Sequence, residues 1–302
     1  MKSIEIKMYL LIQKIRETLF FSFDPTIRMK IGKKKLFINL SHKLPMHYYR
    51  YKNYDKALPR ICQQLKNIDN YLGVVDIGAN IGDTVSLIND EVNGKFLCIE
   101  GDDKFFPILE KNVKLIKEPS LVKIEKCYCG DKVDDFSVIR ENGTAKIVKN
   151  KLSNNDLLSV KTLDDIIDKN MSFGPFNVLK TDTDGFEIDV LNGGKNFLKE
   201  HKPLIYFEFT PQLYAANNQN YKDIFNLLKE CGYKESLFYD NFGEVIKKIN
   251  IEDYNEIEGM VNKIDEKNIY YYDILIYNKD KNGYSKILES ELNLFKNNDK
   301  QN

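Results

Sequence analysis

The sequence predicts an α/β fold in which helices cover both faces of a mostly parallel sheet, and two observations support this prediction. From residue 73 onward, short apolar runs of strand length alternate with segments of helical spacing, as in repeated βαβ units. The first of these strands leads into a glycine-containing turn that opens a helix, a junction typical of ligand-binding sheets. The chain has 302 residues, 42% of them hydrophobic, which is enough to bury one large core.

The predicted sheet has seven strands, with helices between them. The strands are expected at residues 73–77, 95–100, 121–127, 176–182, 203–210, 233–239 and 270–277. The helices are expected at residues 83–89, 104–116, 162–169, 186–198 and 221–231, and a hairpin-like excursion at 136–150. The last two strands, with a turn at 240–243, are expected to form an antiparallel edge.

Two shorter segments flank this main domain of residues 71–278. Residues 1–70 are predicted to form a small α+β extension, made of a helix at 1–20, a hairpin around Gly32 and a helix at 54–70. We expect the extension to cover the substrate site or to mediate dimerisation, which would make the protein a homo-oligomer. Residues 279–302 are rich in Lys, Asn and Glu and are predicted to be a peripheral polar tail.

The composition excludes several classes of protein. The 45 basic and 45 acidic residues give a formal net charge of +0, so the chain lacks the basic footprint of a nucleic-acid binder. The five cysteines are an odd number and are expected to be buried, reduced thiols rather than a disulfide framework. The apolar run at residues 8–12 is too short for a membrane span, and no small-residue cleavage site follows it. We therefore expect a cytoplasmic protein without stable membrane insertion.

The turn after the first strand indicates the cofactor. The strand ends at Asp76, and the glycines at 78 and 82 allow backbone and ligand to approach closely. A dinucleotide fingerprint needs a second glycine at the position of Asn80, so that a pyrophosphate can approach. The carboxylate of Asp76 is also a poor neighbour for phosphate and suits an ammonium or sulfonium group. The turn therefore favours S-adenosylmethionine over NAD, with the predicted binding residues Asp76, Gly78, Asn80, Gly82, Asp83 and Thr84.

Two further acidic residues are predicted to bind the same cofactor. Glu100 ends the second strand, where an acidic side chain can accept hydrogen bonds from both ribose hydroxyls of a nucleoside. Asp131 follows the third strand and would reach the adenine amino group. The alternatives are a solvent-exposed acid for Glu100 and an ordinary Gly-Asp turn for Asp131.

A second acidic segment, Lys180-Thr181-Asp182-Thr183-Asp184-Gly185-Phe186-Glu187, follows the fourth strand. Together with Asp76–Gly82, Ile99-Glu100, Thr162–Asp165 and Phe207-Glu208, it resembles the FkbM family of methyltransferases. One departure is Asp184, which stands where the family usually has Glu. The resemblance implies a class I methyltransferase fold, Rossmann-like, and O-methylation of a small-molecule or glycan acceptor. Family members often act on sugars of surface polysaccharides or on secondary metabolites.

An alcohol must lose its proton to accept a methyl group, so a nearby base would assist the transfer. Asp182 is the first candidate, because the end of its strand faces the ligand edge of the sheet, and Glu208 on the next strand is the second. His42 and His47 in the extension are a third possibility. Alternatively, Asp182 and Glu208 would hold a divalent cation that lowers the pKa of the acceptor. No metal ligand is assigned from the sequence.

Two other functions fit parts of the pattern. One is an NAD- or nucleotide-dependent sugar-modifying enzyme, against which Asn80 weighs. The other is a non-catalytic module that keeps the fold and binds S-adenosylmethionine. The presence of both Asp76 and Lys180-Thr181-Asp182 weighs against the module.

Overall fold

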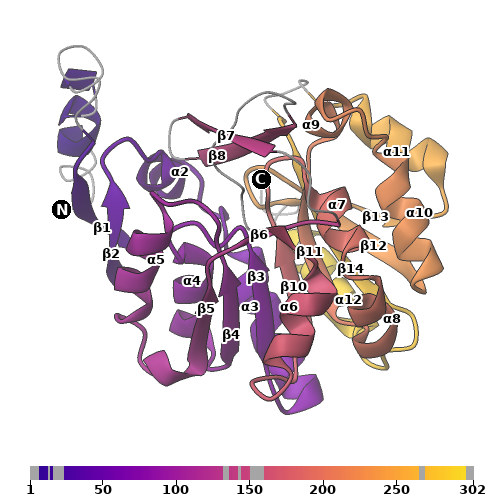
Figure 1. Cartoon of the computed structure of the whole chain (residues 1–302). Coiled ribbons are helices and arrows are strands. Elements are labelled where there is room, and N and C mark those ends of the chain that lie inside the picture. Colours follow the sequence, from indigo (N-terminus) through magenta and orange to yellow (C-terminus); the bar gives the residue numbers. More distant parts are fainter. Residues whose placement is uncertain are drawn as a thin grey trace.

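The computed structural model describes residues 7–12, 14–15, 24–131, 136–141, 144–149, 160–264 and 269–296. An eight-stranded sheet forms its centre (Figure 1). Its strands, in spatial order, are β13 (Val245–Asn250), β12 (Tyr233–Asp240), β14 (Tyr272–Asn278), β11 (Leu204–Phe209), β10 (Val178–Thr181), β3 (Gly73–Ile77), β4 (Lys95–Ile99) and β5 (Val122–Glu125). The strands from β11 to β5 are parallel, and β14, β12 and β13 pair in antiparallel fashion. The predicted Rossmann-like, class I architecture is confirmed.

Helices cover both faces of the sheet, as predicted. One face packs against α6 (Leu163–Asn170), α7 (Glu187–Asn192), α8 (Lys195–His201), α10 (Lys222–Glu230) and α11 (Tyr254–Val261). The other face packs against α3 (Ala57–Asp69), α4 (Asp83–Glu91), α5 (Phe106–Val113) and α12 (Ser285–Lys296). The apolar side chains between these layers form two large buried clusters, one on each side of the sheet.

The remaining elements are short and lie outside the main sheet. They are β1 (Thr26–Ile31), β2 (Lys34–Asn39), α2 (Leu44–Arg50), a 3-10 turn at Pro119–Leu121, β6 (Tyr128–Cys129), β7 (Phe136–Glu141), β8 (Thr144–Lys149), β9 (Val160–Lys161) and α9 (Pro211–Ala216). The strands β7 and β8 form the hairpin expected at 136–150. Of the helix predicted over 1–20, residues 7–12 and 14–15 are helical, and the rest lies outside the described residues.

The sheet has one strand more than the seven predicted. The additional strand, β13, pairs with β12 at the edge of the sheet, and the turn at 240–243 joins these two strands rather than β12 and β14. Lys247 in the middle of β13 is exposed, as is Ile246, and the neighbouring Lys248 is half-buried. Exposed lysines are common on edge strands, and they lower the apolar content by which a strand is found in a sequence.

The helix predicted over 186–198 is two helices, α7 and α8, separated by Gly193 and Gly194. A Cβ atom on Gly193 would lie 2.3 Å from the carbonyl oxygen of Gly130, so the chain needs glycine here to pass so close to the backbone of another segment. Three short helices, α2, α9 and α11, were not predicted. Each has only six to eight residues, too few for a clear periodic pattern.

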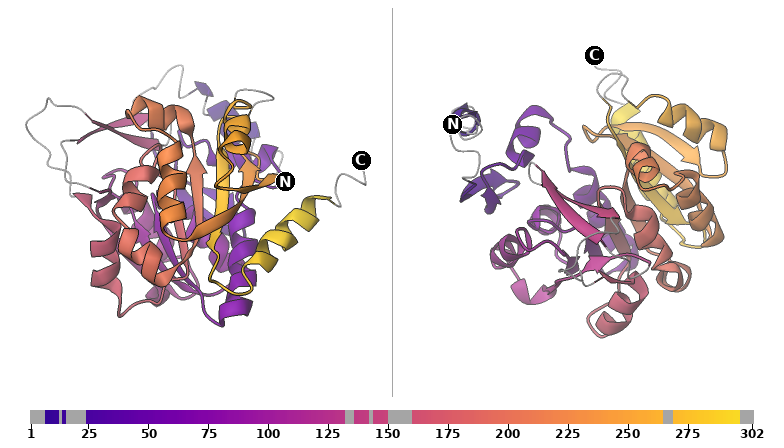
Figure 2. Two further views of the ribbon diagram at one scale, coloured as in Figure 1. Left: turned by 90° about the vertical axis from the view of Figure 1, so that its right-hand side faces the viewer. Right: turned by 45° about the horizontal axis from the view of Figure 1, so that its top comes forward.

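The N-terminal hairpin is held against α5 of the main domain. Asn112 of α5 accepts a hydrogen bond from the Phe37 backbone N–H at 2.7 Å and donates one to the Phe37 carbonyl at 2.9 Å. Leu36, Ile38 and the side chains around Phe105 form a third buried cluster beneath the hairpin. The hairpin therefore lies at the opposite end of the molecule from α10 and α11 (Figure 2).

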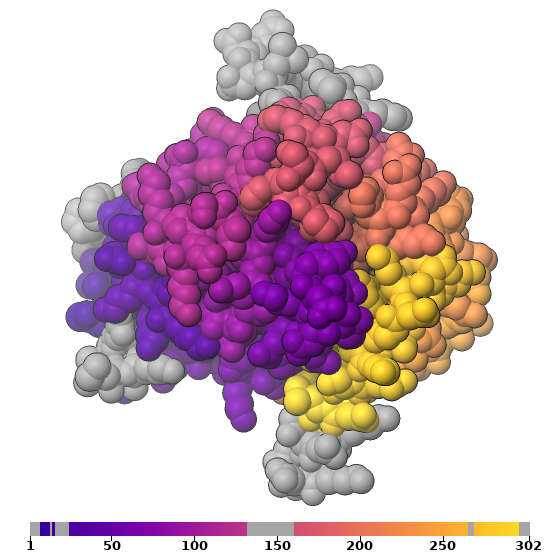
Figure 3. All heavy atoms as spheres, turned by 90° about the horizontal axis from the view of Figure 1, so that it is seen from below, coloured from indigo at the N-terminus to yellow at the C-terminus, as the bar shows by residue number. Residues whose placement is uncertain are grey.

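The segment after β14 differs from the predicted peripheral tail, because α12 packs on the core. Ile287 and Leu288 of α12 are fully buried. Glu291 is 1% exposed and receives two hydrogen bonds from Arg60 of α3, the shorter at 2.7 Å. Seen from below, α12 lies beside the purple residues of α3 (Figure 3). The extension and the C-terminal segment thus meet on one face of the sheet.

The cysteines are reduced thiols, as expected from their odd number. All five cysteines are buried and free. In the described ranges, no helix combines the length and the apolar character needed to cross a lipid bilayer.

Candidate active site

The site lies where four strands of the sheet meet. The parallel strands β3, β10 and β11 end at the same edge, and the antiparallel strand β14 begins there. Strand pairing sets Lys180 beside Asp76, and Glu208 beside Asp273. Ligands of open α/β sheets bind at this carboxyl edge. The order of the strands therefore gathers acidic side chains from distant parts of the sequence around one lysine.

Lys180 is the cation at the centre of this group. Its ammonium lies 3.3 Å from the Asp76 carboxylate and 3.3 Å from the Asp182 carboxylate. It also donates a hydrogen bond to the Gly78 carbonyl at 3.4 Å. Burial opposes the charge of Lys180, but the two carboxylates outweigh burial and raise its pKa above the ordinary value. Lys180 therefore stays protonated and ties the end of β10 to the glycine turn after β3.

Two adjoining cavities open at this edge. The central cavity has a volume of about 370 Å³ and brings together six of the predicted site residues, Gly78, Asn80, Asp83, Thr84, Asp182 and Glu208. The side cavity has a volume of about 70 Å³ and contains Glu100. Gly78, Asn80, Asp182 and Asp184 line both cavities, so one ligand can extend from one cavity into the other.

The glycine turn lies between the two cavities, and its shape depends on the glycines that the sequence places there. Gly78 has φ +74°, and a Cβ atom there would lie 1.9 Å from the carbonyl oxygen of Asp182. Only glycine fits at this approach between the turn and the end of β10. Gly82 also has a positive φ, +80°, and precedes the first residue of α4. Because neither glycine carries a side chain, the backbone of the turn is accessible at the ligand-binding edge of the sheet.

Glu100 fixes the other side of the turn. Its carboxylate accepts hydrogen bonds at 2.7 Å from the backbone N–H groups of Asn80 and Asp102. Burial raises the pKa of Glu100 to about 7, although both hydrogen bonds oppose that shift. The rings of Phe105, Tyr128 and Phe186 line the same cavity. Flat apolar walls and a carboxylate at the end of β4 fit the nucleoside part of S-adenosylmethionine.

Three predicted cofactor residues do not line either cavity. Asp76 is fully buried beneath Lys180, where burial raises its pKa and Lys180 opposes the shift. Gly82 lies at the start of α4. Asp131 follows β6, with its Cα atom close to Gly193. Asp76 therefore pairs with Lys180 beneath the cavity, and the contact of Asp131 with adenine stays a prediction.

Several acidic and aromatic residues of the central cavity were not predicted. Asp55 and Tyr54 come from the extension, Tyr206 comes from β11, and Tyr271 and Asp273 come from the start of β14. Burial raises the pKa of Asp273 well above its usual value, and the nearby charge of Asp55 adds to the shift. The local sequence offers one signal for Asp273, namely a polar residue at the start of an otherwise apolar strand. It offers none for Asp55, which lies in a loop.

The predicted base candidates all lie at the central cavity. Asp182 is 45% exposed and is paired with Lys180. Glu208 accepts a hydrogen bond from the Thr210 hydroxyl at 2.8 Å, and burial, with the charge of Asp182, raises its pKa well above the usual value. Burial lowers the pKa of His42 to about 4, so its imidazole is neutral at physiological pH. His47 stacks on Tyr54 with ring centroids 5.2 Å apart.

No metal centre is formed by the part of the chain that the structure describes. No group of three or more His, Cys, Asp or Glu side chains there is arranged to hold a metal ion. Asp182 is paired with Lys180, and Glu208 accepts a hydrogen bond from the Thr210 hydroxyl.

Known proteins give a family match and distant structural similarities. No curated protein matches the chain. Among solved structures, a methyltransferase FkbM from Methylobacillus flagellatus KT is 19% identical, with a TM-score of 0.38, over 56% of this chain and 40% of that one. A precorrin-6y C5,15-methyltransferase from Geobacter metallireducens is 11% identical, with a TM-score of 0.37, over 69% and 81% of the two chains. A geranyl diphosphate methyltransferase solved in complex with S-adenosylmethionine is 8% identical, with a TM-score of 0.41, over 74% and 85%.

The chain therefore spans less than half of the Methylobacillus protein. The family match is more direct than these similarities. The model of the methyltransferase FkbM domain matches residues 76–235, which is more than half of the chain and includes the glycine turn, Glu100, the second acidic segment and Glu208. The chain belongs to the FkbM methyltransferase family.

Proposed function

We propose that this protein transfers a methyl group from S-adenosylmethionine to a hydroxyl oxygen of a sugar, a surface polysaccharide or a secondary metabolite. The observation that supports the proposal best is the pair of adjoining cavities at the carboxyl edge of the sheet. The side cavity suits a nucleoside, and the central cavity is acidic and large enough for a second molecule. The family match supports methyl transfer, and the hydroxyl acceptor comes from the resemblance in sequence.

In this proposal the glycine turn and Glu100 bind the cofactor. The cofactor supplies a methyl group on a positively charged sulfur, which is a good leaving group, so the protein mainly has to align the acceptor. The carboxylates around the central cavity favour a cationic sulfur over a phosphate. Asp182 and Glu208 lie on the acceptor side, and Asp76 acts through Lys180. The extension would cover the acceptor site, and the position of Tyr54 and Asp55 at the central cavity supports this part of the proposal.

Methyl transfer itself tests the proposal. The protein is incubated with S-adenosylmethionine that carries a radioactive methyl group and with neutral, amino and acidic methyl glycosides. We expect the label to appear in at least one glycoside, with one S-adenosylhomocysteine formed for each methyl group transferred. Binding of S-adenosylhomocysteine without any methyl transfer would favour a cofactor-binding module, and copurified NAD would favour an NAD-dependent sugar-modifying enzyme.

Glu100→Gln tests the nucleoside pocket. Gln keeps the acceptor oxygen for one backbone N–H but loses the negative charge, and hydrogen bonds to charged groups are stronger than neutral ones. We expect calorimetry to show that the affinity for S-adenosylhomocysteine falls roughly tenfold. Glu110→Gln on the exposed side of α5 is the matched control and should leave the affinity unchanged, because Glu110 lines neither cavity. Equal affinities of wild type and Glu100→Gln would contradict the assignment.

A further inference from the structure

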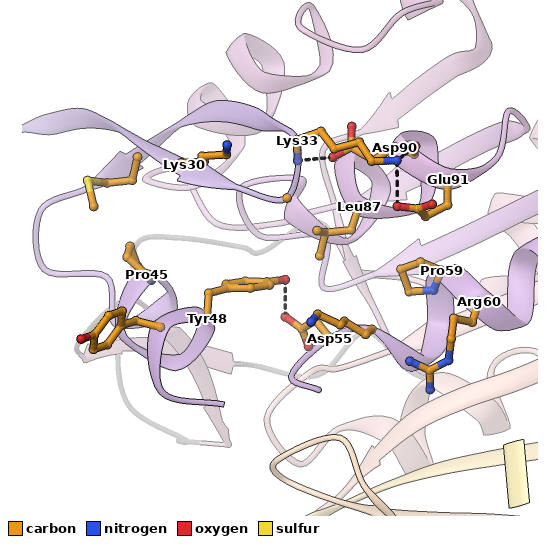
Figure 4. Close-up of a pocket in the computed structure, with 14 residues that line it drawn as sticks. Lys30, Lys33, Pro45, Tyr48, Asp55, Pro59, Arg60, Leu87, Asp90 and Glu91 are labelled. Carbon is orange, nitrogen blue, oxygen red and sulfur yellow. Dashed lines mark hydrogen bonds and ion pairs between the residues drawn. The ribbon is translucent and has the colours of Figure 1, made fainter. Parts of the chain in front are cut away.

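A third cavity adjoins the central cavity on the side of the extension (Figure 4). This outer cavity has a volume of about 400 Å³ and lies between the hairpin β1–β2 and the helices α2, α3 and α4. Asp55, Pro59 and Leu87 line both the outer and the central cavity. The two cavities therefore meet at these three residues, and Asp55 is the only ionisable group among them.

Asp55 is held in place at this junction. Its backbone has φ +52°, a conformation that costs energy for any residue except glycine and that is often found at functional sites. The hydroxyl of Tyr48 on α2 donates a hydrogen bond to its carboxylate at 2.9 Å (Figure 4). The loop that contains Asp55 also contacts the turn after β12, where the rings of Tyr51 and Phe242 have centroids 4.5 Å apart. The extension thus fixes one carboxylate at the edge of the central cavity.

The groups that face Asp55 are mostly acidic. They are Asp83 of α4, Asp182 and Lys180 at the end of β10, and Asp273 of β14. Burial raises the pKa of Asp55 to about 7, the charge of Asp83 adds to this shift, and the hydrogen bond from Tyr48 opposes it. A carboxylate with a pKa near neutrality is well suited to accept a proton from an alcohol.

The two base candidates from the sequence have partners of their own. Asp182 pairs with Lys180 at 3.3 Å, so its charge already serves an ion pair. Glu208 accepts a hydrogen bond from the Thr210 hydroxyl at 2.8 Å, and burial raises its pKa well above the usual value. Asp55 instead accepts a hydrogen bond from the neutral hydroxyl of Tyr48.

The outer cavity has the character of a substrate pocket. Met29, Pro45, Pro59 and Leu87 give it apolar walls, and Tyr49 at its edge is half exposed. Two of its cations are engaged in ion pairs, Lys33 with Glu91 at 3.0 Å and Arg60 with Glu291 at 2.7 Å. An uncharged acceptor with an apolar face fits such walls, and the carboxylate of Asp55 at the junction disfavours an anionic acceptor.

We propose that the acceptor reaches the methyl group through the outer cavity and that Asp55 takes the proton of its hydroxyl. The inference rests on the proposed function. As the acceptor oxygen forms its bond to the methyl carbon, the bond from that carbon to sulfur breaks and leaves its electron pair on sulfur. The hydroxyl proton moves to the Asp55 carboxylate and later to water. This places the proton acceptor in the extension rather than at Asp182, the first candidate from the sequence.

Two cofactor analogues test the position of Asp55 without any acceptor. Sinefungin carries an ammonium group where S-adenosylmethionine carries its methyl group, whereas S-adenosylhomocysteine carries nothing there. If Asp55 faces the methyl position, Asp55→Asn weakens the binding of sinefungin and leaves that of S-adenosylhomocysteine unchanged. We expect the ratio of the two affinities, measured by calorimetry, to fall roughly tenfold, as for the loss of a hydrogen bond to a charged group. Asp182→Asn should change this ratio less.

Asp90→Asn is the matched control, because Asp90 lines the outer cavity but not the central one, and it should leave the ratio unchanged. An unchanged ratio in Asp55→Asn, with both analogues bound, overturns the assignment of Asp55 while the proposed function stands. If wild type binds neither analogue, the proposed function itself fails.

With any glycoside that the wild type methylates, Asp55→Asn should lower kcat about 100-fold or more. Tyr48→Phe leaves the Asp55 carboxylate in place and should retain most of the affinity for sinefungin. Comparison of the two variants therefore separates loss of the Asp55 charge from a general disturbance of the loop.

Discussion

Lys180 shows how a single residue can link stability to the site. Its ammonium and the Asp76 carboxylate are both buried, and the ion pair between them joins the ends of β3 and β10. Removing one partner of a buried ion pair leaves the other charge without compensation, which costs more than the pair itself contributes. The same lysine lines the central cavity, so any change at Lys180 also changes the shape of the site.

We predict that Lys180→Met lowers the free energy of unfolding by about 3 kcal/mol at pH 7, measured by urea denaturation. The loss should become smaller as the pH falls. Burial already raises the pKa of Asp76 in the folded wild type, and without Lys180 nothing opposes that shift, so Asp76 takes up a proton in mild acid and its unpaired charge disappears.

The control for this prediction is Lys229→Met, which removes an exposed ion pair with Glu252. Exposed pairs contribute less than about 1 kcal/mol, so this variant should be close to the wild type. Equal losses of stability in Lys229→Met and Lys180→Met would contradict the stronger contribution expected of the buried Lys180 pair.

The residues of the site could be predicted where the local pattern determines them. Gly78 is required by a close approach within one strand–turn–helix unit, and Glu100 ends the next strand, so both could be placed from sequence alone. Asp55 and Asp273 could not be placed, because their position depends on how the extension docks and on where β14 inserts in the sheet. Asp76 was correctly placed at the end of its strand, but its burial beneath Lys180 depends on the pairing of β3 with β10.

Among the elements, α12 shows how a polar segment can belong to the core. Its sequence is rich in charged residues, but Tyr284, Ile287 and Leu288 come together on one side of the chain and are buried. Glu291 adds a polar contact, since it accepts hydrogen bonds from Arg60 on α3 and from the Tyr239 hydroxyl on β12 at 3.1 Å. One carboxylate thus connects a C-terminal helix, an N-terminal helix and a strand.

We predict that Glu291→Gln lowers the free energy of unfolding by about 2 kcal/mol, because Arg60 loses the charge that compensates its own. Guanidinium denaturation measures the change. Glu289→Gln, on the exposed side of the same helix, is the matched control and should stay within about 0.5 kcal/mol of the wild type. If both variants unfold like the wild type, α12 is held by its apolar side chains alone.

Elements with a strong apolar pattern were predicted well, and elements that depend on partners were not. The strands β3, β4, β10 and β11 are buried on both faces, and apolar residues make up most of their sequences. In contrast, β13 is recognisable as a strand only once β12 is present to pair with it, since three of its six residues are exposed. The break between α7 and α8 likewise has its cause in another segment, the backbone at Gly130.

The whole molecule is neutral, but its negative charge is concentrated at the site. The formal net charge is +0, and yet Asp55, Asp83, Asp182, Asp184, Glu208 and Asp273 all line the central cavity, together with Lys180 as its one lysine. Burial raises the pKa of Asp55 to about 7 and that of Asp83 to about 6. Repulsion among these like charges lowers the stability of the fold, and the same charges attract a cationic ligand to the site.

This concentration of charge gives the ligand-free protein a distinctive response to pH, which Asp273→Asn reveals. Burial raises the pKa of Asp273 in the folded protein well above its ordinary value of 3.8. The folded protein therefore holds a proton there that the unfolded chain releases. The free energy of unfolding falls as the pH rises, because ionising Asp273 costs more in the folded state than in the unfolded chain. We predict that Asp273→Asn raises Tm by roughly 2–4 °C at pH 8 and leaves it unchanged at pH 4, measured by calorimetry. The exposed Asp280 provides the control: its pKa is lowered by a hydrogen bond from Lys202, so Asp280→Asn should not raise Tm at pH 8. A lower Tm of Asp273→Asn at pH 8 would show instead that the ionised carboxylate stabilises the fold.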